Sequence, residues 1–152
     1  MIFEAYYFSP WALINVQSEN NKIISISFIV ASPIYSQWTI EISNCIHQLD
    51  EYFKGKRKDF NISFLLEGSS FSKKVFKVIQ DIPYGSVRTY EEIANLINHP
   101  KAQRAVGTCL KKNPLVIIIP CHRVVNKDNK KISYNYGSDI KKNLLYNEQK
   151  FS

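Results

Sequence analysis

Cysteine is scarce in this chain, and long uncharged apolar runs are missing. The 152 residues include three cysteines, whose odd number and irregular spacing argue against a disulfide framework and favour a reducing compartment. No apolar run is long enough to cross a bilayer, and no basic segment precedes an apolar one at the N-terminus, as it would in a secretory signal. We therefore expect a protein without disulfides, membrane spans or an export signal.

Clustered metal ligands are missing as well. Cys45, Cys109, His47 and His99 stand singly along the chain, whereas a zinc site needs four ligands at short, recognisable spacings. Internal repeats and low-complexity tracts are also absent. The sequence therefore predicts no metal site.

Acidic residues are few in the second half of the chain. Residues 1–72 hold five Lys/Arg and seven Asp/Glu, a net charge of −2, whereas residues 73–152 hold fifteen and six, a net charge of +9. A basic surface often serves only solubility, but this segregation favours a polyanionic partner such as nucleic acid. The hydrophobic content of 45% is enough for one or two small packed domains.

The first half has the pattern of a small sheet. Residues 3–9, 11–18 and 22–30 are predicted to form three antiparallel strands, the third by its clear alternation of apolar and polar side chains. The residues expected to face inward from the third strand are Ile24, Ile26, Phe28 and Val30.

A helix is predicted between residues 37 and 53, where the spacing of apolar residues changes to that of a helix. Its inner face would contain Trp38, Ile42, Cys45, Ile46, Leu49 and Phe53. Residues 62–65 are a candidate last strand, and residues 67–70 are a candidate linker between two subdomains.

The second half has the pattern of helices. An apolar stripe over residues 71–82 predicts one helix, and Thr89 with Glu92 has the spacing of a capping box that opens the next. Pro100 suits the first turn of a third helix, expected to run to about Lys112. Two short helices in succession, the second basic, suggest a helix-turn-helix. A final helix is predicted from about residue 139 to residue 149.

The most distinctive stretch runs from Ile117 to Val125. Val116–Ile119 predicts a strand buried on both faces, and Pro120, which lacks an N–H, ends it just before Cys121. A thiol at such a break is sheltered from bulk water yet reachable from a pocket, and a base such as His122 can raise its thiolate fraction. Taken alone, such a cysteine is more often a small buried hydrophobe.

This stretch resembles the active-site signature of the O6-alkylguanine-DNA alkyltransferases. The resemblance is carried by Asn113-Pro114 and Pro120-Cys121-His122-Arg123-Val124. Further matching segments are Pro83-Tyr84-Gly85, Thr89-Tyr90, Arg104-Ala105-Val106-Gly107, Leu144-Leu145 and Glu148. The match covers residues 71–148 well and the first 70 residues only by general pattern.

The resemblance implies an α+β fold in two domains. Residues 1–68 would form an N-terminal α/β domain, in which an antiparallel sheet and a helix make a ribonuclease H-like fold. Residues 69–152 would form a mainly helical, winged-helix-like domain, whose helix-turn-helix binds DNA and which carries the active site.

The implied function is DNA repair by a methylated-DNA–protein-cysteine S-methyltransferase. Such an enzyme transfers the alkyl group of O6-alkylguanine, mainly O6-methylguanine and with O4-methylthymine as a further candidate, to its own cysteine. Because a thioether is a poor leaving group, each molecule turns over once and is consumed. The partner would be double-stranded DNA, contacted in the minor groove with the alkylguanine flipped out.

The same resemblance implies a monomer that needs no cofactor, membrane or obligate protein partner. It would be located in the cytoplasm with the DNA, or in the nucleus if the source is a eukaryote.

Catalytic roles follow from matching positions. Cys121 would be the nucleophile, His122 a base acting through a water, and Glu148 the carboxylate that orients the imidazole. The remaining matches are Asn113, which braces the turn around the active site, and Tyr90, which donates to the leaving base.

Binding roles follow in the same way. The substrate-binding matches are Tyr90, Val124 through its carbonyl, Tyr134, and Asn135 through its N–H. The DNA-binding matches are Thr89, Ala102, Arg104, Ala105, Gly107 and Arg123. Arg104 would fill the gap left by the flipped nucleotide. The small residues Ala102, Ala105 and Gly107 fit ordinary helix packing equally well.

One loop departs from the family pattern. Where the family has Gly-x-Tyr-Ser-Gly-Gly, this chain has Ile132-Ser133-Tyr134-Asn135-Tyr136-Gly137. Tyr136 stands at a usual glycine position, so we expect the loop to follow a different path or to narrow the pocket.

Three other functions remain as alternatives. An alkyltransferase-like damage-binding module shares the fold but typically has Trp in place of the cysteine, which Cys121 argues against. In a helix-turn-helix regulator without transfer activity the thiol would be incidental. A cysteine hydrolase built on Cys, His and Glu would turn over repeatedly and would not require DNA.

Overall fold

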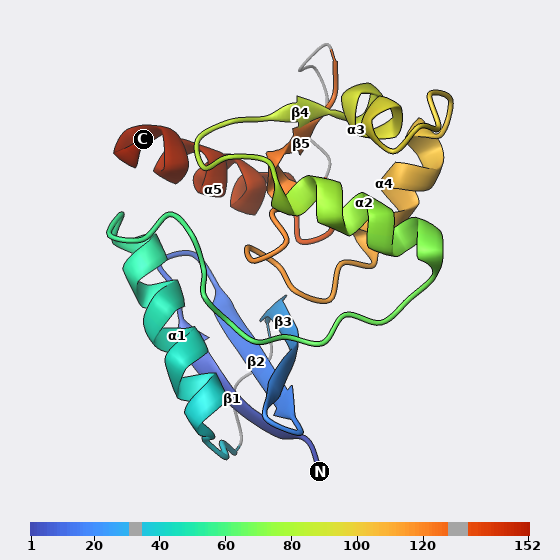
Figure 1. The fold of residues 1–152 in the computed structure, drawn as a ribbon. Coiled ribbons are helices and arrows are strands. Elements are labelled where there is room, and N and C mark those ends of the chain that lie inside the picture. Colours follow the sequence, from blue (N-terminus) through green and yellow to red (C-terminus); the bar gives the residue numbers. More distant parts are fainter. Residues whose placement is uncertain (31–34, 128–133) are drawn as a thin grey trace. The chain divides into compact units, whose positions relative to one another are not determined.

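The computed structural model describes residues 1–30, 35–127 and 134–152, which are divided into two compact units (Figure 1). The first unit holds Met1–Leu66 with Pro114–Val116, and the second holds Glu67–Asn113 with Ile117–Ser152. Within the described ranges, no helix has the length and apolarity needed to cross a membrane.

An antiparallel sheet forms the core of the first unit, as the sequence predicts. Its strands are β1 (Phe3–Phe8), β2 (Leu13–Glu19) and β3 (Lys22–Ile29), in the order β1-β2-β3. Helix α1 (Ile40–Phe53) lies along the sheet (Figure 1). Ala5 pairs with Val16, and Val16 with Ile26, all three fully buried. Because side chains alternate along a strand, Ala5 shares its face with Tyr7, whose ring stacks on Phe53 of α1 at 5.9 Å.

The inward face of β3 differs in part from the prediction. Ile26 and Phe28 are buried as expected, but Ile23 is buried in place of Ile24, and Val30 lies beyond the strand and is exposed. The cause is a register shift between Gln17 and Ser18, where a β-bulge moves the alternation by one residue. Residues 62–65 form no strand; Phe64 makes a single parallel bridge to Ile23.

Helix α1 begins three residues later than predicted. Thr39 is its N-cap, with a side-chain oxygen that accepts a hydrogen bond from the N–H of Ile42 at 3.2 Å. Trp38 therefore precedes the helix and is exposed, which corrects its assignment to the inner face. The predicted residues that are buried are Ile42, Cys45, Leu49 and Phe53.

The second unit consists mainly of short helices. They are α2 (Ser70–Gln80), α3 (Tyr90–Leu96), α4 (Gln103–Lys111), the 3₁₀ helix η1 (Cys121–Arg123) and α5 (Ser138–Phe151). Two two-residue strands, β4 (Arg88–Thr89) and β5 (Val124–Val125), pair in parallel. The mainly helical character of this half is as predicted.

The start of α3 is confirmed and the start of α4 is corrected. The N–H of Glu92 donates to the Thr89 hydroxyl at 3.1 Å, while the N–H of Thr89 donates to the Glu92 carboxylate at 3.2 Å, so the capping box is complete. Pro100 is not in the first turn of α4. The N–H of Ala102 donates to the carbonyl of His99, so a separate turn precedes the helix.

The run of branched residues before the cysteine is not a strand. Val116, Ile117 and Ile119 are buried as predicted, but Ile117 has φ +72°, and residues 117–118 form a turn. Propensity for extended backbone is overridden here by tertiary context. The preceding segment Pro114–Val116 pairs with β3, because the N–H of Ile26 donates to the Pro114 carbonyl and the N–H of Val116 donates to the Ile26 carbonyl. The turn then redirects the chain into η1, which begins with Cys121.

Candidate active site

Cys121 lies at the start of η1, almost fully buried at 5% exposure. The side-chain amide of Asn113 donates to its sulfur at 3.1 Å and to the carbonyl of Ile119 at 2.9 Å. One amide group thus holds both the nucleophile and the turn before it. The bracing position predicted for Asn113 is consistent with this geometry.

Burial raises the pKa of the Cys121 thiol. The Asn113 hydrogen bond, the charge of Lys141 and the nearby Tyr134 hydroxyl oppose this shift without reversing it. The resting side chain is therefore a protonated thiol, and it needs a base when it reacts.

His122 and Glu148 form a buried pair across η1 and α5. Imidazole Nε2 lies 2.6 Å from a carboxylate oxygen of Glu148, and neither side chain is more than 1% exposed. Because a carboxylate only accepts, Nε2 carries the hydrogen and Nδ1 keeps a lone pair. Nδ1 is buried, and no side chain or backbone group in the described ranges hydrogen-bonds to it.

The protonation states of this pair follow from burial and charge. Burial lowers the pKa of His122, aided by the charges of Arg123 and Lys141 and opposed by Glu148. Burial alone would raise the pKa of Glu148, but hydrogen bonds from His122 and Arg123 and the positive charge of Arg123 hold it well below its usual range. The pair is therefore a neutral imidazole hydrogen-bonded to an ionised carboxylate.

Arg123 does not occupy the DNA-contacting position predicted for it. Its side chain is buried and binds both carboxylate oxygens of Glu148, with Nε at 2.8 Å from one and Nη2 at 3.0 Å from the other. Nη1 donates to the carbonyl of Ile82 at 2.7 Å. All three guanidinium nitrogens are engaged, because a buried carboxylate needs charged partners. This residue is not available to a DNA phosphate.

Lys141 is a buried residue near the thiol that the sequence analysis missed. Its side chain is 3% exposed, and Nζ donates to the carbonyl of Val124 at 2.5 Å. Burial lowers its pKa to about 8, against the opposing effect of Cys121. The sequence did contain a signal for its burial, because Lys141, Leu144 and Glu148 have the spacing of one helix face.

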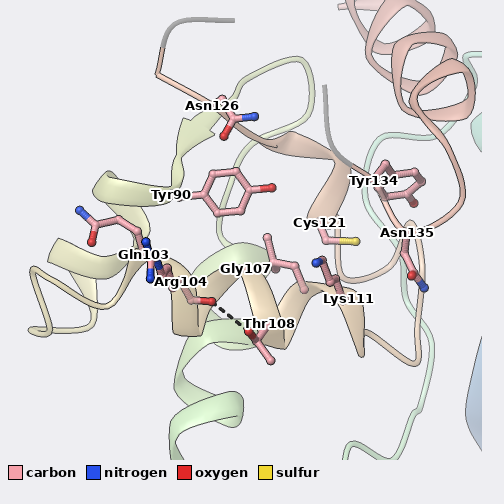
Figure 2. Close-up of a pocket in the computed structure, with 11 residues that line it drawn as sticks. Tyr90, Gln103, Arg104, Gly107, Thr108, Lys111, Cys121, Asn126, Tyr134 and Asn135 are labelled. Atoms are coloured by element: carbon pink, nitrogen blue, oxygen red, sulfur yellow. Dashed lines mark hydrogen bonds between the residues drawn. The ribbon is translucent and has the colours of Figure 1, made fainter. Parts of the chain in front are cut away.

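A pocket of about 520 Å³ opens beside Cys121 (Figure 2). It is lined by Tyr90, Gln103, Arg104, Gly107, Thr108, Leu110, Lys111, Cys121, Asn126, Tyr134 and Asn135. Figure 2 shows the Tyr90 ring reaching into the space between α4 and the segment that carries Asn126. A Cβ added to Gly107 of α4 would lie 3.8 Å from this ring, at ordinary van der Waals distance.

The structure brings some predicted binding residues together and leaves others apart. Tyr90, Tyr134 and Asn135 line the pocket with the thiol, and so do Arg104 and Gly107. Val124, Thr89, Ala102 and Ala105 are not among its lining residues. Gln103, Thr108, Lys111 and Asn126 line it without having been predicted, since polar residues on helix and loop surfaces give no distinctive signal in one sequence.

Tyr136 packs against Tyr134, a residue that lines the pocket. It is not among the lining residues, and its ring packs edge-on against that of Tyr134, with 5.7 Å between centroids. Ile132 and Ser133, from the same loop, fall outside the described residues. In the part of the chain that the structure describes, no group of three or more His, Cys, Asp or Glu is placed to hold a metal ion.

Comparison with known proteins identifies both parts of the chain. Residues 2–66 match the ribonuclease-like domain of 6-O-methylguanine DNA methyltransferase, and residues 70–150 match its DNA-binding domain. A methylated-DNA–protein-cysteine methyltransferase of Methanosarcina barkeri is 49% identical over 67% of this chain and 65% of its own length. One from Mycolicibacterium paratuberculosis is 35% identical over 95% of this chain and 90% of its own length.

Structural similarity extends over nearly the whole chain. The crystal structure of a Mycobacterium tuberculosis relative in complex with DNA superposes with a TM-score of 0.88, at 31% identity, over 97% of this chain and 92% of that one. The alignments with the first two curated relatives span less than two thirds of those proteins, 65% and 63% of their lengths. Both family matches and the structural similarity nonetheless lead to one conclusion: the chain belongs to the 6-O-methylguanine DNA methyltransferase family.

Proposed function

We propose that this protein repairs DNA by transferring the alkyl group of O6-alkylguanine to its own Cys121. The observation that carries the proposal is a buried thiol at the wall of a pocket, next in sequence to a His122–Glu148 pair in which the imidazole keeps a lone pair. The relatives named as methylated-DNA–protein-cysteine methyltransferases support it. O6-methylguanine is the main substrate, and O4-methylthymine is a further one.

The reaction is an in-line displacement at carbon. The Cys121 sulfur attacks the alkyl carbon, the carbon–oxygen bond breaks, and its electron pair goes to the guanine oxygen. The thiol proton passes through a water to Nδ1 of His122, the buried nitrogen without a protein partner in the described ranges. Glu148 stabilises the imidazolium that forms, because its carboxylate already accepts from Nε2.

The leaving guanine anion is stabilised by donors in the pocket. Burial raises the pKa of Tyr90, so its hydroxyl stays protonated and can donate to the departing base. The N–H of Asn135 donates to the guanine oxygen, and the carbonyl of Val124 accepts from the base. The thioether formed on Cys121 is a poor leaving group, so each molecule acts once. The reaction requires no cofactor.

Recognition of DNA rests on the basic second half of the chain. Helix α4 lies in the minor groove, and Arg104, exposed at the pocket, fills the gap of the flipped nucleotide. Thr89, Ala102, Ala105 and Gly107 complete the DNA-contacting surface. Extrusion of the base costs a few kcal/mol of stacking, which these contacts offset. The protein acts as a monomer at the DNA, in the cytoplasm or in a eukaryotic nucleus.

The test of this function is the site of alkylation. After incubation with a duplex containing O6-methylguanine, peptide mass mapping should place one added methyl group on Cys121 and none on Cys45 or Cys109. Cys121→Ser should still bind DNA in a salt-dependent manner but should not accept the methyl group, because a hydroxyl is a far weaker nucleophile at neutral pH. A methyl group on Cys109, or repeated turnover, would contradict the proposal.

Replacing the exposed arginine at the pocket separates base flipping from chemistry. Arg104→Ala should slow methyl transfer from duplex DNA by tenfold or more, the effect of losing about 1.4 kcal/mol or more of support for the flipped state. Transfer from the free base should change little, because no flipping is needed. Arg57→Ala, in the first unit, is the control. Equal losses on duplex and free base would assign Arg104 to chemistry or folding instead.

Tyr136 should limit the size of the alkyl group. A methyl group should transfer efficiently, whereas free O6-benzylguanine should react poorly, because the Tyr136 ring packs against Tyr134 and leaves that wall of the pocket little room to move. Tyr136→Gly should recover part of the benzylguanine reaction, and Tyr136→Phe, which keeps the ring, should not. Labelling rates with benzylguanine measure this. No gain in the glycine variant would defeat the steric argument.

A further inference from the structure

We propose that Arg123 and the turn Ile82–Gly85 form a clamp that holds Glu148 in place and keeps the His122 imidazole neutral. The inference rests on the proposed function, since it concerns the base of that reaction. Arg123 and the turn residues act on the base through Glu148, so they are positioning residues. The clamp also gives a structural role to Pro83-Tyr84-Gly85, a motif that takes no part in the proposed reaction.

The turn contacts the ion pair from two sides. The carbonyl of Ile82 accepts from Arg123 Nη1 at 2.7 Å, and the Tyr84 ring lies under the guanidinium, 5.6 Å from ring centroid to its carbon. The N–H of Gly85 donates to the Glu148 carboxylate at 3.2 Å. The guanidinium and the carboxylate are thus both held by the same four-residue turn.

Glycine is required at the end of this turn. Gly85 has φ +80°, a conformation that residues with a side chain rarely adopt, and an added Cβ would lie 2.9 Å from Cβ of Ser152. A larger residue would therefore be strained at the position whose N–H binds Glu148. The backbone geometry of the turn and its contact with the carboxylate are therefore coupled.

The charged groups around His122 determine whether its imidazole is neutral and can act as the base. Glu148 and Lys141 face the imidazole from α5, Arg123 adjoins it on η1, and the Cys121 thiol precedes it. The Tyr84 phenol lies next to Arg123 and Glu148 from the turn. Burial already favours the neutral imidazole, whereas the Glu148 carboxylate would favour the protonated form. Arg123 offsets the carboxylate, because its charge pairs with Glu148 and repels a second positive charge. His122 is thereby left able to accept the thiol proton.

The experiment measures His122 directly and the reaction separately. Arg123→Gln removes the charge, and Arg123→Lys keeps it but loses the two-pronged contact with the carboxylate. Tyr84→Leu removes the ring, and Tyr84→Phe is its matched control. The imidazole is titrated by ¹⁵N NMR, with the His122 signal assigned by its loss in His122→Gln. Single-turnover methyl transfer from duplex DNA is then measured against pH.

In Arg123→Gln, the pKa of His122 should rise by roughly one unit or more, the effect of removing a nearby like charge. The rate is lost as pH falls through this pKa, so the acid limb of the profile should move to higher pH by the same amount. Arg123→Lys should leave the pKa near its original value but shift the proton resonance of the His122 Nε2–H and slow transfer at all pH values. Tyr84→Leu should shift the same resonance, and Tyr84→Phe should not.

A purely structural role would give a different result. The variants would then lose thermal stability while the His122 pKa, the Nε2–H resonance and the acid limb stayed unchanged, which would overturn the clamp. If Arg123→Gln does not fold, the clamp is tested by the Nε2–H resonance of His122 in Arg123→Lys and Tyr84→Leu. Arg57→Gln, which breaks an ion pair with Glu51 in the first unit, controls for loss of charge.

Failure of the clamp and failure of the function are separable. The NMR titration needs neither DNA nor transfer. A protein that transfers no methyl group would disprove the proposed function and leave the titration as the test of the clamp.

Discussion

The ionised carboxylate of Glu148 is the constraint on which the rest of the site depends. A buried charge is costly unless it is paired and hydrogen-bonded, and at 1% exposure this one accepts from His122, Arg123 and the backbone of Gly85. These donors come from η1 and from the turn before β4, while Glu148 itself is on α5. Satisfying one carboxylate therefore joins three segments distant in sequence, and it sets the tautomer of the histidine beside the nucleophile.

The electrostatics suit a thiol that is activated only when needed. Burial raises the pKa of Cys121 and lowers that of His122, so both groups rest in their neutral forms. A permanently ionised thiolate would be open to oxidation and to stray electrophiles. In the proposed reaction, charge develops only as the proton moves toward Nδ1. Lys141, a buried cation within electrostatic reach of the sulfur, then favours the transient thiolate.

Local signals in the sequence predicted the parts of the fold that local physics controls. The capping box at Thr89 and most of the buried face of α1 depend on spacing within a few residues. The capping box is confirmed, and Ile42, Cys45, Leu49 and Phe53 are buried as predicted. The segment Val116–Ile119 was predicted to be a buried strand. Three of its residues are buried, but Ile118 is only partly buried and a turn at Ile117 replaces the strand, after Pro114–Val116 pairs with β3. The β-bulge at Ile24 in β3 and the helix cap at Thr39 likewise explain why Ile24 and Trp38 do not face the core as predicted.

The residues of the active site were likewise predicted where a motif marked them and missed where their role depends on contacts between distant segments. Cys121, His122 and Glu148 were selected by motif resemblance, and in the structure His122 contacts Glu148. Arg123 was misassigned because the adjacency of four motif residues says nothing about which way each side chain points. Lys141 was missed because a lysine on an amphipathic helix is usually solvent-exposed. Burial of a charge depends on partners from other segments, here the Val124 carbonyl, and these are visible only once the chain is folded.

The most direct test of this account is the tautomer of His122 in the unreacted protein. The ¹⁵N chemical shifts of its two ring nitrogens, measured near neutral pH, report which of them carries hydrogen. The account predicts a neutral imidazole with hydrogen on Nε2, bound to Glu148, and an unprotonated Nδ1. An imidazolium at neutral pH, or a neutral ring with its hydrogen on Nδ1, would contradict it, because neither could accept the thiol proton at that nitrogen.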